Sequence, residues 1–402
     1  MQERGRRSAL EFHNARFYVA GQALSNIGTF SQIVALSLLV LSLTDSGVAL
    51  GAVMAVQAVP MILLGFWAGP RLDRLELRRV LVVTAVAGAA QAAFLAGLSV
   101  TGTISLPWIF ALSLVLGCVQ AFERPAAQAF IAELVPREAI PSAVGLASAA
   151  QSIGRLGGPA LAAVLYAWSG SGSVFAVNAL SYAAVLVSLM LLRGAELLPR
   201  PLHTGKRTDM SAALAFAWHL PAVRSVLLAN VVIGLFTFNF ATFFASISSL
   251  TFGQPSLFGI AESVNAVTSL MAGFVFARYL RHPTTRLVGL ASIGLGSSLA
   301  WAALAPTPAW FIASMPYFGF AVVWYVTSSQ ALVQQRTPPE MGGRIMSLYT
   351  LGTMGTTPLG ALIVGVVVDY VSPRAAIGLG ASSAMLVGLV LVLTTLWPRH
   401  RA

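Results

Sequence analysis

A few ionisable side chains lie inside stretches of this sequence that are apolar enough to cross a membrane. Glu123 and Arg124 are neighbours, Arg155 follows in the same half, and Glu262 lies in the second half. Such charges are costly in lipid and usually face a partner or a water-filled cavity. Because removal from water favours a protonated carboxyl group, Glu262 and Glu123 are candidates for proton coupling. Alternatively, Arg124 neutralises Glu123, which would leave it no coupling role.

A polar stripe runs along the first apolar stretch. Gln22, Ser25, Thr29 and Gln32 recur at intervals of three and four residues, which places four hydrogen-bonding side chains on one helical face. With Asn26 and Arg155, they are candidates for lining a solute cavity. The alternative is that these groups hydrogen-bond between helices and hold them together.

Aromatic residues gather in two later stretches. Phe236 and Asn239 lie in a run with four more phenylalanines, and Trp324 and Tyr325 lie in another apolar run. Aromatic walls with a few polar groups suit bulky, partly apolar solutes, so these four residues are further cavity candidates. Phenylalanines that face lipid are the alternative.

Other kinds of chemistry have no support in the sequence. The five histidines are scattered and show no metal-ligand spacing, and there is no phosphate-binding GxxxxGK[ST] loop. We therefore expect no metal, no cofactor and no catalytic residues, and a protein that is not an enzyme. No nucleic-acid partner is expected either, because the net charge of +11 is better explained by membrane topology.

The elements that must carry these residues are membrane-spanning helices. The chain has 402 residues, of which 57% are hydrophobic and 9% charged, whereas soluble domains carry about 25% charged residues. A spanning helix needs about 20 apolar residues, and the apolar runs are about twice as long as β-barrel strands. The expected spans are 17–41, 48–69, 80–100, 106–127, 140–168, 174–192, 222–250, 257–278, 286–305, 309–332, 344–369 and 375–397.

The arginines of the connecting segments indicate the orientation. If both termini are cytoplasmic, Arg374 is the only basic residue in the outer loops, as the positive-inside rule predicts. The expected location is the cytoplasmic membrane of a prokaryote. Asp369, near the outer end of its span, is expected to be an interfacial charge.

The two halves of the chain are related. AGPRLDRLELRRVL from Ala68 aligns with AGFVFARYLRHPTTRL from Ala272, and VPREAIPSAVGL from Val135 aligns with TPPEMGGRIMSL from Thr337. Both pairs are about 200 residues apart, which indicates duplication. The sequence therefore predicts an all-α membrane protein with twelve helices, divided into a six-helix bundle (1–192), a cytoplasmic linker (193–221) and a second six-helix bundle (222–402).

Several motifs resemble the major facilitator superfamily. Gly69-x-x-x-Asp73-Arg74-x-x-x-Arg78-Arg79 is similar to the loop signature of that family. The segments that begin AFERPAAQAF at Ala121 and RTPPEMGGRI at Arg336 resemble its drug-exporter branch, related to macrolide and enterobactin efflux proteins. The resemblance implies that the first, fourth, seventh and tenth helices line the central cavity. Ala127 stands where the branch usually has an arginine, so the branch's charge relay is not carried over.

The resemblance also implies two mechanical elements. Gly69, Asp73, Arg74, Arg78, Arg79 and Arg124 would form a conformational latch, in which Asp73 meets the start of the helix near Gly343 and pairs with Arg124. The alternative is an ordinary basic loop that sets topology. Gly154, Gly158 and Pro159 resemble a signature of antiporters, and close packing of small residues is the alternative.

The expected function is secondary active export of small amphipathic molecules from the cytoplasm, by proton antiport and alternating access. The alternatives are uptake or facilitated diffusion of a polar solute, and lipid flipping by the same fold. The expected partners are the solute, protons and membrane lipid, and we expect a monomer.

Overall fold

The computed structural model describes residues 8–72, 75–198, 210–279, 283–338 and 341–396. Over these residues it contains helices and loops and no β-strand. Eleven helical stretches among the residues described are long and apolar enough to cross a membrane. One of them, Arg137–Met190, is interrupted at Ser169 and Gly170, where Gly170 has a φ of 76° that glycine adopts without strain. This stretch therefore supplies two spans, and the predicted twelve are confirmed.

The chain divides into two compact units. One combines Met1–Leu39 with Val56–Thr204, and the other combines Val40–Ala55 with Gly205–Ala402. We call them the N-terminal and C-terminal units. The division after Thr204 falls within the expected linker, but the end of the first span and the start of the second belong to the C-terminal unit.

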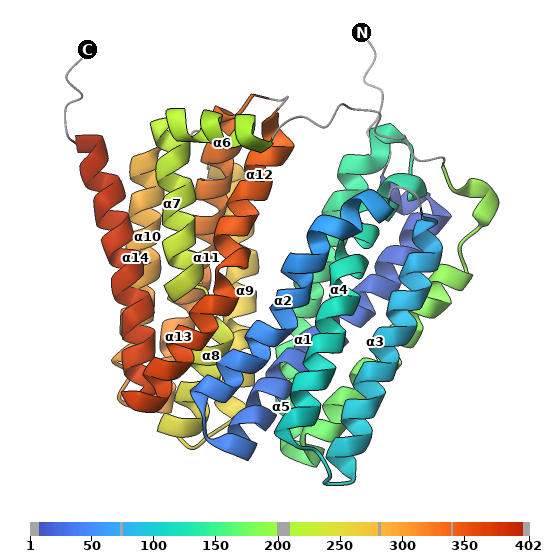
Figure 1. Ribbon diagram of the computed structural model, residues 1–402, viewed down its shortest axis with the longest axis horizontal. Helices are drawn as coiled ribbons and strands as arrows, with labels where there is room; N and C mark the ends of the chain where they lie inside the picture. The colour runs from blue at the N-terminus through green and yellow to red at the C-terminus, as the bar shows by residue number, and fades with distance from the viewer. Residues whose placement is uncertain (1–7, 73–74, 199–209, 280–282, 339–340, 397–402) are drawn as a thin grey trace. The chain divides into compact units, whose positions relative to one another are not determined.

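The first half of the chain holds five long helices and three short 3₁₀ turns, of which η2 joins α4 to α5. In chain order the elements are η1 Ala9–Glu11, α1 His13–Thr44, α2 Gly47–Leu72, α3 Leu77–Val100, α4 Leu106–Leu134, η2 Arg137–Ala139, α5 Ile140–Met190 and η3 Gly194–Glu196 (Figure 1).

The second half is more often interrupted. Its elements are α6 Met210–His219, α7 Pro221–Phe236, α8 Phe240–Ser246, the π-helix η4 Ile247–Thr251, α9 Ser256–Tyr279, α10 Thr285–Ala303, α11 Pro308–Arg336, α12 Gly342–Thr350, the π-helix η6 Leu351–Gly355, α13 Thr357–Tyr370 and α14 Pro373–Leu396. The expected continuous spans 222–250 and 344–369 are thus broken. The expected linker also contains a helix, α6, which lies crosswise to α7 (Figure 1).

Small residues allow the helices within each unit to pack closely. Gly289 of α10 and Gly388 of α14 lie against each other's backbone, as is typical where membrane helices cross at short distance. In the N-terminal unit, Gly88 of α3 lies against the ring of Tyr182 in the second half of α5.

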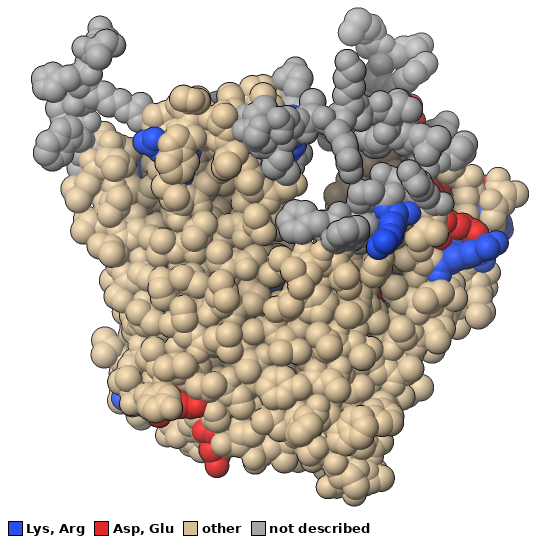
Figure 2. All heavy atoms as spheres, in the orientation of Figure 1, with Lys and Arg blue, Asp and Glu red and all other residues tan. Residues whose placement is uncertain are grey.

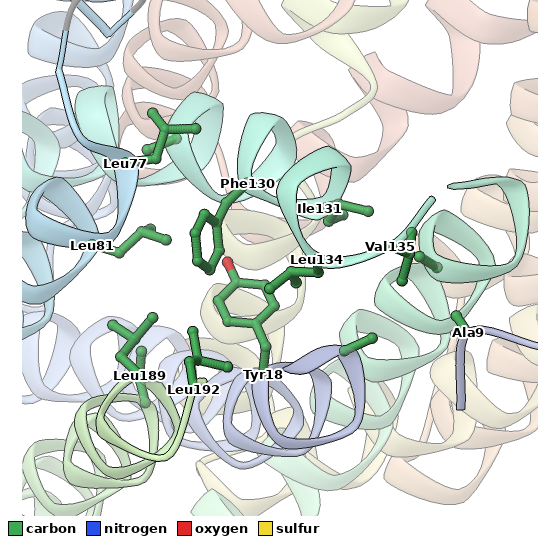
Figure 3. Packing of buried hydrophobic residues seen from close by; sticks show 14 of the residues in the cluster. Ala9, Tyr18, Leu77, Leu81, Phe130, Ile131, Leu134, Val135, Leu189 and Leu192 are labelled. Carbon is green, nitrogen blue, oxygen red and sulfur yellow. The ribbon is translucent and has the colours of Figure 1, made fainter. Parts of the chain in front are cut away.

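An apolar cluster at one end of the N-terminal unit holds α1, α3, α4 and α5 together (Figure 3). Tyr18 of α1 and Phe130 of α4 meet edge to face, with ring centroids 5.2 Å apart. Leucines of α3 and of the end of α5 surround them, namely Leu77, Leu81 and Leu189. This cluster fixes Tyr18 next to the polar groups described below.

Charged side chains on the visible face gather near the helix ends. Between them lies a broad uncharged surface (Figure 2). An uncharged surface bounded by charges is what a membrane-spanning protein presents to lipid.

Candidate solute and proton sites

The predicted polar stripe on α1 separates into two groups. Gln22 and Thr29 are half-buried, as is the adjacent candidate Asn26, whereas Ser25 and Gln32 are only 4% and 2% exposed. The members of one helical face therefore differ in whether they can reach a solute.

Gln32 is used within the helix packing. Its Oε1 accepts a hydrogen bond from Asn178 Nδ2 at 2.7 Å, and its Nε2 donates to Gln91 Oε1 at 3.3 Å. Gln91 in turn donates to the carbonyl oxygen of Leu112 at 3.2 Å. This chain of amides joins α1, α3, α4 and α5, so for Gln32 the structure favours the alternative of polar contacts between helices.

Glu123 lies half-buried on α4 among groups from three helices. Tyr18 of α1, Tyr182 of α5 and the adjacent Arg124 lie close enough to interact with it electrostatically. Gln22 Nε2 donates to the Tyr18 hydroxyl at 3.3 Å, and the side chains of Tyr182 and Thr29 are hydrogen-bonded. The half-buried members of the α1 stripe thus connect to the surroundings of Glu123.

The alternative contact, in which Arg124 neutralises Glu123, is not formed. In the part of the chain that the structure describes, no ion pair within 4.0 Å and no hydrogen bond involves the Glu123 carboxylate. Arg124 is exposed, and its Nη2 donates to Gln120 Oε1 at 3.5 Å. Glu123 is therefore a partly buried carboxylate without a cation in contact.

Glu262 lies half-buried on α9 and has polar neighbours on its own helix. Asn265 Nδ2 donates to Glu262 Oε2 at 3.5 Å, and Ser269, one turn further along, donates to the carbonyl oxygen of Gly319 on α11 at 3.2 Å. Glu262 therefore stands at a polar seam between α9 and α11.

Gly154 and Gly158 bring α5 against α1. A side-chain carbon at Gly154 would collide with Asn26, and one at Gly158 would collide with Phe30 and the backbone of Ile27. Ser31 Oγ donates to the carbonyl oxygen of Gly158 at 2.8 Å, and Pro159 is buried. The three residues predicted as an antiporter signature thus form a close helix seam. Arg155, within it, is exposed, with its guanidinium carbon 5.7 Å from the centroid of the Phe30 ring.

The expected latch lies partly outside the described residues, which include neither Asp73 nor Arg74 nor the surroundings of Gly69. Arg78 Nη2 donates to the carbonyl oxygen of Leu189 at 2.7 Å, and Arg79 Nε pairs with Glu76 Oε2 at 2.5 Å. The recorded partners of these two arginines belong to the N-terminal unit. Both contacts lie at the start of α3, and the latch itself stays a prediction.

The aromatic residues of the C-terminal unit pack mainly on one another. Phe243 and Phe244 are 0% exposed, so the alternative that they face lipid is wrong. Tyr325 is buried as well, and its hydroxyl donates to Asn230 Oδ1 at 2.7 Å. Asn239 is buried at the break after α7, where its Nδ2 donates to the carbonyl oxygen of Leu235 at 3.0 Å.

Two of the predicted aromatic cavity residues keep partial exposure. Phe236 and Trp324 are half-buried, and Trp324 stacks on Phe276 with an interplanar angle of 13°. These two remain cavity candidates, whereas Tyr325 and Asn239 serve the packing of the unit.

Asp369 has a structural role that the sequence prediction missed. Its Oδ2 accepts hydrogen bonds from Ser46 Oγ at 2.6 Å and from the Val48 amide at 3.1 Å, and its Oδ1 accepts one from the Gly47 amide. Ser46 Oγ accepts a hydrogen bond from the Ala49 amide at 3.1 Å. The carboxylate thus caps the first turn of α2, where free amides and the helix dipole favour a negative charge.

Glycines continue this contact between α2 and α13. A side-chain carbon at Gly47 would collide with Val368, one at Gly51 with the carbonyl group of Ala361, and one at Gly365 with the backbone of Gly47. The serine and glycine before span 48–69 were a detectable helix-start signal, but their partner on α13 is too distant in the chain to be found that way. Asp369 is therefore part of a helix interface, not simply an interfacial charge.

A family model described as a transmembrane secretion effector matches residues 11–402. The chain belongs to this major facilitator superfamily group. Three transporters are similar in sequence to this chain along most of its length. The staphyloferrin A transporter of Staphylococcus aureus is 24% identical over 88% of this chain and 89% of its own. Macrolide efflux protein A of Streptococcus pyogenes is 25% identical over 89% and 90%. The multidrug efflux pump Tap of Mycolicibacterium fortuitum is 22% identical over 90% and 90%.

Solved transporters share the fold. The nucleoside transporter NupG has a TM-score of 0.72 and 15% identity, covering 96% of this chain and 100% of its own. A POT family transporter in complex with a thioalcohol-conjugated peptide has a TM-score of 0.75 and 12% identity, covering 95% of this chain and 96% of its own. The predicted family and fold class are confirmed. This member of the transmembrane secretion effector family is a multi-pass membrane transporter and not an enzyme.

Proposed function

We propose that the protein exports small amphipathic molecules from the cytoplasm of a prokaryote in exchange for protons. It would work by alternating access, with both termini on the cytoplasmic side. The names of two relatives, a macrolide efflux protein and a multidrug efflux pump, support export of such solutes. Solute and proton must bind the inward-facing and outward-facing states differently, because a ligand with equal affinity for both shifts nothing.

Glu123 is the residue that carries the proposal. It is a partly buried carboxylate with no cation in contact among the described residues, and Tyr18, Tyr182 and Arg124 surround it. A carboxyl group in such a place can be neutral in one conformation and ionised in another, since water and the nearby guanidinium decide which form is favoured. Glu262 is the second candidate, and it already has Asn265 as a hydrogen-bond partner.

The test is transport in proteoliposomes with an imposed pH gradient and a panel of amphipathic compounds. We expect the gradient to drive concentrative movement, and Glu123→Gln to reduce that movement to the level of empty liposomes while solute binding persists. Glu123→Gln keeps the size of the side chain but cannot ionise. Glu138→Gln, at an exposed position in η2, is the matched control and should transport normally.

Three outcomes would contradict the proposal or its assignment to Glu123. Concentrative movement that continues after the gradient is dissipated would exclude proton coupling. Full gradient-driven movement by Glu123→Gln would exclude this residue, and loss in Glu262→Gln alone would transfer the role to Glu262.

A further inference from the structure

The first half of α5 carries a polar face in the middle of a membrane span. Ser148, Gln151 and Arg155 are exposed and follow one another at intervals of three and four residues, so they lie on one side of the helix. Arg155 lies fifteen residues after Ile140 and fourteen before Ser169, which places it near the centre of the span. The serine hydroxyl is satisfied, because Ser148 Oγ donates to the carbonyl oxygen of Val144 at 2.9 Å.

This face cannot be turned toward lipid at a low cost in free energy. A guanidinium at the centre of a bilayer is strongly disfavoured unless it meets water or a partner. In the part of the chain that the structure describes, no carboxylate lies within 4.0 Å of Arg155. Its recorded partner is the ring of Phe30, 5.7 Å from the guanidinium carbon to the centroid, and a ring face attracts a cation without neutralising it.

The neighbouring surface of α1 adds an unused hydrogen-bonding group. Asn26 lies against Gly154, the residue before Arg155. Its half-buried side-chain amide has no hydrogen-bond partner among the described residues. Ser31 holds the same two helices together through the carbonyl oxygen of Gly158. One seam of the N-terminal unit therefore presents a guanidinium, a primary amide and an aromatic face together.

We propose that this seam is an anion subsite, which binds a carboxylate of the transported solute. The planar fork of arginine matches the two oxygens of a carboxylate, the amide of Asn26 can donate a further hydrogen bond, and Phe30 lies against an apolar part of the solute. The inference rests on the proposed transport function and names its substrate class: amphipathic molecules that carry a carboxylate. An oxyanion from a phospholipid headgroup has similar chemistry, and the experiment separates the two sources.

The probe is a set of aryl carboxylates such as 2-naphthylacetate, each paired with its neutral amide. Binding is measured by fluorescence to the purified full-length protein in nanodiscs of phosphatidylcholine, without a gradient. We expect the wild-type protein to prefer each acid over its amide by at least about tenfold, the effect of one hydrogen bond to a charged group. Arg155→Gln should lose the preference, and Arg155→Lys should retain part of it.

The matched control is Arg137→Gln, which removes an exposed arginine of η2, just before α5 begins, and should leave the preference unchanged. Equal binding of acids and amides by the wild-type protein overturns the proposal, as does an unchanged preference in Arg155→Gln. A thermal unfolding measurement on each variant identifies any that fails to fold, and Arg155→Lys then serves as the decisive variant.

Two further measurements separate solute from phospholipid as the source of the oxyanion, and the anion subsite from proton antiport. If phosphatidylglycerol added to the nanodiscs displaces the acids from the wild-type protein but not from Arg155→Gln, the subsite belongs to lipid and the solute assignment is wrong. Absence of acid preference together with gradient-driven export of neutral compounds would refute the subsite and leave proton antiport standing. Acid-selective binding with gradient-independent movement would refute antiport and leave the subsite standing.

Discussion

The amide of Gln32 makes two hydrogen bonds inside the N-terminal unit, one from Asn178 and one to Gln91. Because the side chain is 2% exposed, its removal would cost each partner one hydrogen bond in an apolar environment. Hydrogen bonds between membrane helices contribute about 0.6 kcal/mol on average and up to about 1.7 kcal/mol. Gln32 is therefore a residue whose role is stability.

We expect Gln32→Leu to lower the free energy of unfolding by about 1–2 kcal/mol, measured by titration with a denaturing detergent. The order in which the transporter prefers its solutes should not change. Gln128→Leu is the control, because Gln128 lies exposed on α4 and should have almost no effect on stability. A changed solute preference in Gln32→Leu, with normal stability, would return Gln32 to the solute cavity.

Among single residues, the sequence patterns identified the polar and charged positions but not their partners. The spacing of Gln22, Ser25, Thr29 and Gln32 placed them on one face of a helix, and all four do lie on α1. Which of them is buried depends on neighbouring helices that spacing does not reveal. Gln32 is closed off by Asn178, a residue 146 positions away, and no local pattern encodes such a pairing.

At the scale of helices, the seam between α1 and α5 depends on glycine at one position and tolerates change at the next. A side-chain carbon at Gly158 would lie 2.6 Å from Phe30 Cβ and 2.9 Å from the Ile27 carbonyl oxygen. At Gly157 the nearest atom would be Ile27 Cγ1, 3.6 Å away, which is an ordinary contact. The backbone atoms near Gly158 cannot move aside without shifting a helix.

We therefore expect Gly158→Ala to destabilise the protein by about 1–3 kcal/mol, the usual cost of overpacking, and Gly157→Ala to be nearly neutral. Thermal unfolding in detergent, followed by tryptophan fluorescence, compares the two variants directly. Equal melting temperatures for both would show that the seam is looser than the structure indicates.

Helix spans were predictable because lipid imposes a length and an apolar composition on each of them. The interruptions inside spans were not predictable in the same way. The expected span 222–250 breaks between α7 and α8, and Gly360 of α13 lies against the carbonyl group of Leu235 at that break. Each of the two interrupted spans also contains a π-helix, η4 after α8 and η6 between α12 and α13. Such changes of hydrogen-bonding register depend on packing between segments far apart in the chain, which periodicity does not reveal.

At the scale of the whole molecule, two helices pass from one unit to the other. α1 does so between Leu39 and Val40, and α2 between Ala55 and Val56. The segment between these points, Val40–Ala55, is held within the C-terminal unit by the cap that Asp369 forms on Ser46, Gly47 and Val48. If the protein works by alternating access, the side of the membrane that this segment faces must open in part of the cycle.

We expect Asp369→Ala to loosen this segment, because the variant removes the acceptor of three hydrogen bonds at the start of α2. The measurement uses Ala361→Cys in a Cys118→Ala background, and a membrane-impermeant maleimide applied to whole cells. Ala361 is 2% exposed and lies against Gly51, so it should react slowly while the cap is present. Loss of charged hydrogen bonds should raise its rate of labelling by at least about tenfold.

Asp45→Asn is the matched control for the cap, because Asp45 has a φ of 48° and asparagine tolerates this left-handed conformation better than alanine does. Asp45 is an exposed carboxylate in the same connection between α1 and α2, and no hydrogen bond to its side chain occurs among the described residues. Its removal changes the local charge equally but leaves the cap intact, so the labelling rate should stay at the wild-type value. Equal increases in both variants would assign the effect to charge alone, and no increase in Asp369→Ala would mean that the glycine contacts of Gly47, Gly51 and Gly365 hold the segment without the carboxylate.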